Sequence, residues 1–180
     1  MLLQQRLELA VAIAHEAGER IVEARQRQDF SHQFKQGTEL VTDVDVAIDT
    51  LISERLETAL PGESRLSEEL APDRALMRSA ESLWIIDPID GTVNFAHGLR
   101  HVAVSIAWAQ QGQTRLGVVH APFLGETFTA LRGQGAWLNG EPIQASRSDS
   151  LERCLLATGF PYQRENRPPL VRRLGAVLAH

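Results

Sequence analysis

The chain has 180 residues, a length typical of one domain or one and a half. Hydrophobic residues make up 43% and charged residues 23%, an ordinary globular balance that argues against a disordered chain. Lys and Arg number 18 against 23 Asp and Glu, and the net charge of −5 makes nucleic acid and anionic membranes poor non-specific partners.

The sequence also indicates where the protein resides. It contains no run of about 18 apolar residues, so we expect no membrane-spanning helix. Its first residues lack the basic start and continuous apolar run of a secretory signal. Cys154 is the only cysteine and cannot form an internal disulfide. Together these features favour a cytoplasmic protein.

Two amphipathic helices are predicted in the first third of the chain. Apolar residues recur at three- and four-residue steps, the period of a helix, over residues 3–27 and again over residues 44–59. Thr42 and Asp45 have the spacing of a capping box and mark the start of the second helix. Between the two helices, residues 35–38 are expected to turn the chain.

A series of strands is predicted next. The continuous apolar run 83–86 is typical of a strand that is buried on both faces. Alternating apolar residues predict an antiparallel meander over 102–108, 116–120 and 126–131, and a further strand is predicted over 155–158. Two helices followed by such strands indicate an α+β fold, with two N-terminal helices packed on a largely antiparallel sheet.

The last predicted element is a helix that begins at Pro168-Pro169, because proline is favoured in the first turn of a helix. Its apolar face continues to Leu178, and the sequence contains no later element that would cover it.

The densest cluster of polar residues is Asp87-Pro88-Ile89-Asp90-Gly91-Thr92, directly after the apolar strand. Its two carboxylates offer the oxygen ligands that hard cations such as Mg²⁺ prefer. Gly91 permits close backbone approach, and a helical turn beginning here would offer free N–H groups to a phosphate. The combination indicates metal-assisted phosphoryl chemistry.

Each acidic signal also has a plain structural interpretation. An isolated D-P-x-D-G sequence is usually a turn. Glu68-Glu69 reads as a solvated surface pair. Asp43 and Asp45 are explained by their place in the first turn of a helix. None of these signals alone decides between function and structure.

The order and spacing of these residues closely resemble the inositol monophosphatase family, whose members are Mg²⁺-dependent, lithium-sensitive sugar-phosphate phosphatases. The resemblance rests on Leu40-Val41-Thr42-x-x-Asp45, Ser67-Glu68-Glu69 and Trp84-Ile85-Ile86-Asp87-Pro88-Ile89-Asp90-Gly91-Thr92-x-Asn94-Phe95. It continues to Ala157-Thr158-Gly159-Phe160-Pro161 and so covers nearly the whole chain.

The resemblance implies a set of metal ligands. Glu68 and Asp87, with the backbone carbonyl of Ile89, would bind a first Mg²⁺. Asp87 and Asp90 would share a second ion, and Asp45 would help to hold a third through water.

The resemblance also implies the catalytic and substrate-binding residues. Glu68 and Thr92 would position and activate the attacking water. The backbone amides of Gly91 and Thr92 would hold the phosphate, with Asp90 also facing the substrate. The implied reaction is hydrolysis of inositol monophosphate, or of a related polyol or sugar phosphate, by in-line attack of metal-activated water.

Two departures from the family pattern stand out. Ser67 occupies the position before the acidic pair, where the family usually has glycine. The family's Trp-Asp-x-Ala-Ala-Gly motif, whose Asp completes the second metal site, does not occur in these 180 residues. We therefore expect an N-terminal metal-binding domain of the sugar phosphatase αβαβα fold over residues 1–150 and the start of a truncated second α/β domain over 151–180.

These departures leave an alternative function open, namely a truncated, weakly active or inactive module that binds metal and phosphate. Family members are commonly dimers, so a homodimer is also an expectation. Two residues near the motif have two interpretations each: His97 contacts substrate or lies on the surface, and Phe95 lines the pocket or anchors the turn to the core.

Overall fold

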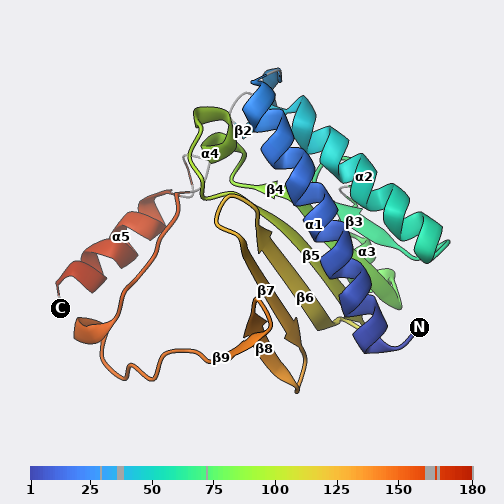
Figure 1. Cartoon of the computed structure of the whole chain (residues 1–180). Coiled ribbons are helices and arrows are strands. Elements are labelled where there is room, and N and C mark those ends of the chain that lie inside the picture. The colour runs from blue at the N-terminus through green and yellow to red at the C-terminus, as the bar shows by residue number, and fades with distance from the viewer. Residues whose placement is uncertain (29, 36–38, 72, 161–164, 166, 180) are drawn as a thin grey trace. The chain divides into compact units, whose positions relative to one another are not determined.

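The computed structural model describes residues 1–28, 30–35, 39–71, 73–160, 165 and 167–179 (Figure 1). The chain divides into two compact units. The first comprises residues 1–33 and 40–143, and the second comprises residues 34–39 and 144–180. The division into domains at residue 150 stays a prediction.

The first unit begins with two long helices, α1 (Leu3–Arg27) and α2 (Asp43–Ala59). Their bounds agree with the predicted ones, and the predicted capping box of α2 is confirmed. The Thr42 hydroxyl accepts from the Asp45 amide at 3.3 Å, and the Asp45 carboxylate accepts from the Thr42 amide at 2.8 Å. Asp45 is only 3% exposed, so the cap is sealed from water.

Within the described part of the chain, seven strands form the main sheet, and they lie in it in the order of the chain. They are β3 (Arg65–Ser67), β4 (Ser82–Asp90), β5 (Ala103–Gln110), β6 (Gln113–Ala121), β7 (Glu126–Leu131), β8 (Gly135–Leu138) and β9 (Glu141–Ile143). β3 runs parallel to β4, and every other neighbouring pair is antiparallel. The predicted antiparallel meander is therefore confirmed.

The core lies between the two long helices and one face of this sheet. In Figure 1, α1 and α2 lie side by side; α1 packs on β5, β6 and β7, and α2 on β4. The sheet contributes alternate residues to this face, including Trp84, Ile86, Val104, Ile106 and Val118, each at most 3% exposed. The arrangement confirms the predicted α+β fold.

Short elements complete the described residues. β1 (His32–Lys35) and β2 (Glu39–Thr42) pair as a two-stranded sheet, while the predicted turn at residues 36–38 lies outside the described residues. Three short helical segments follow, α3 (Leu76–Ser79), α4 (Thr92–His97) and the 3₁₀ turn η1 (Leu151–Arg153). The predicted C-terminal helix is present as α5 (Arg167–Leu178).

The predicted strand over residues 155–158 is wrong. The segment is neither helix nor strand, and Leu155 is fully exposed. An isolated strand leaves its backbone N–H and C=O groups without ladder partners, and no described strand pairs with this segment. Among the described residues, no helix is long and apolar enough to cross a membrane.

Candidate functional site

The candidate site begins where β4 ends, at Asp87 and Asp90. Asp87 pairs with Ser105 of β5 and Asp90 with Ala103, so β4 carries one more residue than β5 between these pairs. Pro88 lies within this bulge, and proline has no N–H to give to a ladder. A bulge re-aims the side chains around it, and here it leaves Asp90 exposed while Asp87 is partly buried.

Gly91 turns the chain from β4 into α4. Its φ of +95° lies in the region that glycine adopts without strain. A Cβ at this position would lie 2.8 Å from the carbonyl oxygen of His101, too close for any other residue. The Gly91 carbonyl accepts the first hydrogen bond of α4, from the Phe95 amide at 2.9 Å. The backbone of the Asp-Gly-Thr segment is therefore fixed on both sides.

The hydroxyl of Thr92 connects this turn to α2. It lies 2.8 Å from Oδ1 of Asp45 and 3.1 Å from the carbonyl oxygen of Ile89. The other carboxylate oxygen of Asp45 belongs to the α2 cap. Asp45 thus connects two segments that are separate in sequence, the start of α2 and the turn after β4, and its orientation is set by the helix that it caps.

Glu68 comes to the same place from the turn after β3. Its side chain interacts with the side chain of Asp87. Burial raises the pKa of Asp87 to about 6, and the negative charges of Asp90 and Asp45 raise it as well. The hydrogen bonds from Glu68 and from the Ile89 amide oppose this shift.

The chemistry of these groups fits a divalent cation. Oδ1 of Asp87 is buried without a hydrogen-bond partner among the described atoms, and carboxylate oxygens are what Mg²⁺ prefers. A cation at this place would relieve the repulsion between the carboxylates of Asp87 and Asp90. As the described side chains stand, no three Asp, Glu, His or Cys residues are gathered closely enough to hold an ion.

The structure thus brings together most of the residues predicted from the sequence. Glu68 contacts Asp87, the charges of Asp90 and Asp45 act on Asp87, and Thr92 bonds to Asp45. Their roles as metal ligands, and the role of the Gly91 amide as a phosphate donor, stay predictions.

The two ambiguous residues near the motif have different surroundings. His97 is exposed, with Nδ1 2.9 Å from the Val93 carbonyl. Phe95 is fully buried, and its ring centroid lies 4.9 Å from that of Phe30. Phe95 therefore anchors the turn to the core.

Sequence reasoning missed Asp49, whose carboxylate is completely buried and binds the turn that carries Glu68. The spacing of residues in α2 does indicate that Asp49 is buried. Asp45, Asp49, Ile52 and Leu56 follow each other at four-, three- and four-residue steps, so Asp49 lies on the buried stripe of α2.

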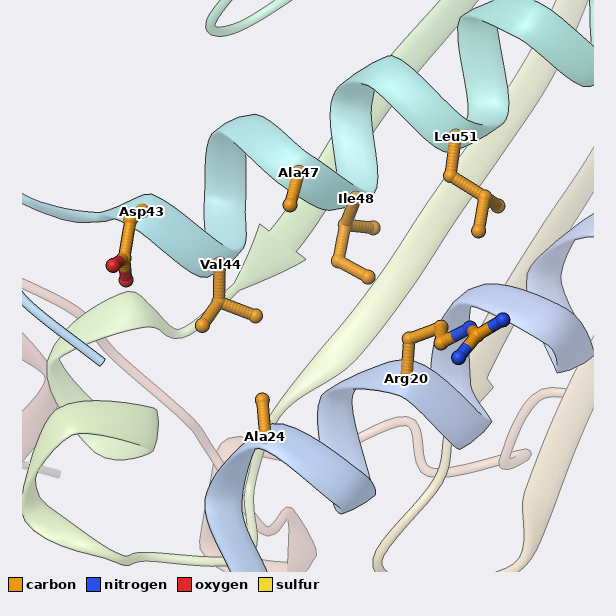
Figure 2. A pocket seen from close by; sticks show the side chains of 7 residues that line it. All are labelled: Arg20, Ala24, Asp43, Val44, Ala47, Ile48 and Leu51. Carbon is orange, nitrogen blue, oxygen red and sulfur yellow. The ribbon is translucent and has the colours of Figure 1, made fainter. Parts of the chain in front are cut away.

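A groove of about 520 Å³ lies between α1 and α2. Figure 2 shows its lining residues, Arg20, Ala24, Asp43, Val44, Ala47, Ile48 and Leu51. The acidic residues of the candidate site are not among them, so the groove belongs to the packing of the two helices.

Comparison with known proteins gives a consistent result. The family model described as "Inositol monophosphatase family" matches residues 2–178. A fructose-1,6-bisphosphatase/inositol-1-monophosphatase of Thermotoga maritima is 35% identical over 180 residues, covering 96% of this chain and 68% of that protein. The Nus factor SuhB of Pseudomonas aeruginosa is 42% identical over 162 residues, covering 89% of this chain and 60% of that protein.

A solved structure agrees with this result. The extragenic suppressor protein suhB from Bartonella henselae matches with a TM-score of 0.86 and 32% identity, covering 98% of this chain and 67% of that one. The chain thus spans roughly three fifths to two thirds of the length of these relatives. The sequence motifs, the fold and these matches together establish that the chain belongs to the inositol monophosphatase family.

Proposed function

We propose that the chain provides the metal-binding half of a Mg²⁺-dependent phosphomonoesterase that hydrolyses inositol monophosphate or a related polyol or sugar phosphate. The observation that carries the proposal is the contact between Glu68 and Asp87 beside the charges of Asp90 and Asp45. The name of the Thermotoga relative, which combines fructose-1,6-bisphosphatase with inositol-1-monophosphatase, supports this substrate class.

The proposed ligands are the four carboxylates and one backbone group. Glu68, Asp87 and the carbonyl of Ile89 would hold a first Mg²⁺, Asp87 and Asp90 would hold a second, and Asp45 would help to hold a third through water. When bound, the ions neutralise charge on the phosphate and on the leaving alkoxide and lower the pKa of water.

The chain's own groups orient the reaction. Glu68 accepts a proton from the attacking water, and the Thr92 hydroxyl, whose proton is directed to Asp45 or Ile89, accepts the water's other hydrogen bond. This places the water for in-line attack on phosphorus. The amides of Gly91 and Thr92 bind the phosphate oxygens, and Asp90 faces the substrate. The rigid turn at Gly91 fixes both amides before the substrate arrives.

Phosphate release from inositol 1-phosphate, followed with and without Mg²⁺, tests the proposal. We expect Mg²⁺-dependent turnover that falls at least about 100-fold in Asp87→Asn and in Glu68→Gln, which remove a proposed ligand or base. Glu69→Gln is the matched control, because Glu69 is the neighbouring carboxylate without a proposed role. Turnover that persists in excess EDTA would exclude the proposal.

A second candidate is a module that binds metal and phosphate without turnover. Several relatives are named Nus factor SuhB, which is not the name of an enzyme. This name supports a role without turnover as the second candidate. Calorimetric Mg²⁺ titration beside the phosphate-release assay separates the two. Cation binding with turnover supports the enzyme, and cation binding without turnover supports the module.

A further inference from the structure

The buried side chain of Asp49 attaches the turn that carries Glu68 to α2. Oδ2 of Asp49 accepts hydrogen bonds from the backbone amides of Glu69 at 3.1 Å and Leu70 at 3.0 Å. Asp49 is 0% exposed. Its other carboxylate oxygen has a weaker contact, with the hydroxyl of Ser53 at 3.4 Å. The backbone amides of the turn are therefore its principal described partners.

A second group closes the same turn. The Ser67 hydroxyl accepts from the Ala71 amide at 3.0 Å, and the Ser67 amide donates to the Ala71 carbonyl at 3.1 Å. The amides of three consecutive residues, 69 to 71, are thus bound by side-chain oxygens. Consecutive amides that converge on one anion form a nest, and here the anion for two of them is the carboxylate of Asp49.

This arrangement gives Ser67 a role that glycine could not have. Glycine, the usual family residue at this position, has no side chain to accept the Ala71 amide. With Ser67, the turn is fixed at its closing end by its own first residue and in its middle by α2. Glu68 lies between these attachment points, so the direction of its side chain depends on both.

We propose that Asp49 is a positioning residue for Glu68: its buried carboxylate, seated on the amides of Glu69 and Leu70, holds the Glu68 side chain against Asp87. The inference rests on the proposed function, because it assigns to Asp49 the orientation of a metal ligand. A charged acceptor binds amides more strongly than a neutral one. The charge of the Asp49 carboxylate, as well as its shape, therefore holds the turn in place.

The experiment compares Asp49→Asn with Ser53→Ala, which removes the other described partner of Asp49 and leaves the turn alone. Hydrogen exchange reads the turn directly. We expect the amides of Glu69 and Leu70 to lose protection in Asp49→Asn, with the amides of β4 and β5 unchanged. Calorimetry reads Mg²⁺ affinity, which should fall about 10- to 100-fold in Asp49→Asn, the loss typical of groups that orient metal ligands. Ser53→Ala should change neither quantity.

A double mutant separates positioning from general stability. If Asp49 acts through Glu68, then Asp49→Asn should cause no further loss of Mg²⁺ affinity in a Glu68→Gln background. The same proportional loss in both backgrounds would overturn the positioning role, and so would unchanged affinity in Asp49→Asn. If Glu68→Gln itself binds Mg²⁺ as the unmodified protein does, the proposed metal site fails. The failure of the metal site is thereby distinguished from that of the positioning role.

Discussion

At Asp87, burial and two neighbouring carboxylates oppose ionisation and raise the pKa to about 6 from an ordinary 3.8. Between these values the folded protein binds a proton that the unfolded chain has released. The free energy of unfolding of the metal-free protein therefore falls as the pH rises from about 4 to 6, and the deficit is complete above pH 6. A group that destabilises its own fold is typical of a binding site.

The first prediction follows from the destabilising effect of the Asp87 charge on the metal-free protein. Asp87→Asn keeps the shape of the side chain and removes its charge, so in EDTA at pH 7.5 it should stabilise the protein by roughly 1–3 kcal/mol. At pH 3.5, where Asp87 is protonated in the folded protein, the variant and the unmodified protein should have the same free energy of unfolding. Urea unfolding at the two pH values measures both. The exposed Asp149 supplies the control, Asp149→Asn, and a destabilised Asp87→Asn at pH 7.5 would contradict the prediction.

The second prediction concerns Gly91. Gly91→Ala combines a positive φ with a Cβ placed 2.8 Å from the His101 carbonyl, whereas Gly133→Ala has a comparable φ and open space around it. Thermal unfolding should show a loss of about 1 kcal/mol for Gly133→Ala and a clearly larger one for Gly91→Ala. Equal losses would mean that the close approach to His101 is not a constraint.

For individual residues, the motif predicted which side chains lie together, but it did not predict the contacts that orient them. The order of Asp45, Glu68, Asp87 and Asp90 was readable because each lies in a recognisable string. The contact between Asp49 and the amides 20 residues later was not, because it depends on how α2 packs beside the turn after β3. Such contacts are set by tertiary packing and leave only a weak trace in local sequence.

Among the secondary-structure elements, α1, β4 and the loop after α2 are connected by one ion pair. Arg6 contacts both carboxylate oxygens of Glu63, at 2.7 and 2.6 Å, and the Trp84 indole N–H donates to Glu63 at 2.8 Å. These hydrogen bonds, above all those from Arg6, lower the pKa of Glu63 below its ordinary value. Because the folded pKa is lowered, the stabilisation is fully present above about pH 4.5 and is lost as the pH falls.

The third prediction tests this connection. Glu63→Gln should lower the free energy of unfolding at pH 7 by about 1–3 kcal/mol, the range for hydrogen bonds to charged groups. Its difference from the unmodified protein should shrink below pH 4. Glu57→Gln, which breaks the more exposed Arg65–Glu57 pair, should cost less than about 1 kcal/mol. A Glu63→Gln difference that is independent of pH would contradict the assignment.

The sequence predicted the elements with strong local signals and missed those without them. Both long helices have a clear apolar period and, for α2, a capping box, and the meander has alternation and turn residues. β3, β8 and β9 have three or four residues each, too few for a period to appear. The strand predicted at 155–158 was wrong because an apolar run does not by itself supply a neighbouring strand.

For the molecule as a whole, the site and the hydrophobic core belong to the same unit. Every residue of the core cluster, and every carboxylate of the candidate site, lies in the first unit. In the second unit, no residue whose exposure is described is buried. The geometry around Asp87 is therefore set by the first unit, and its stability should not depend on the segment that follows β9.

The fourth prediction uses this difference. Residues 144–160 carry only the three-residue turn η1 and contain no buried residue, so their backbone can enter a protease without unfolding the core. Limited trypsin digestion should cut first at Arg147 and Arg153, and the N-terminal product should keep the unfolding midpoint of the intact chain within a few degrees. Mass spectrometry of the first fragments and thermal scans of the product measure both. A first cut within β4 to β7, or a product that unfolds at once, would show that the core depends on the residues after β9.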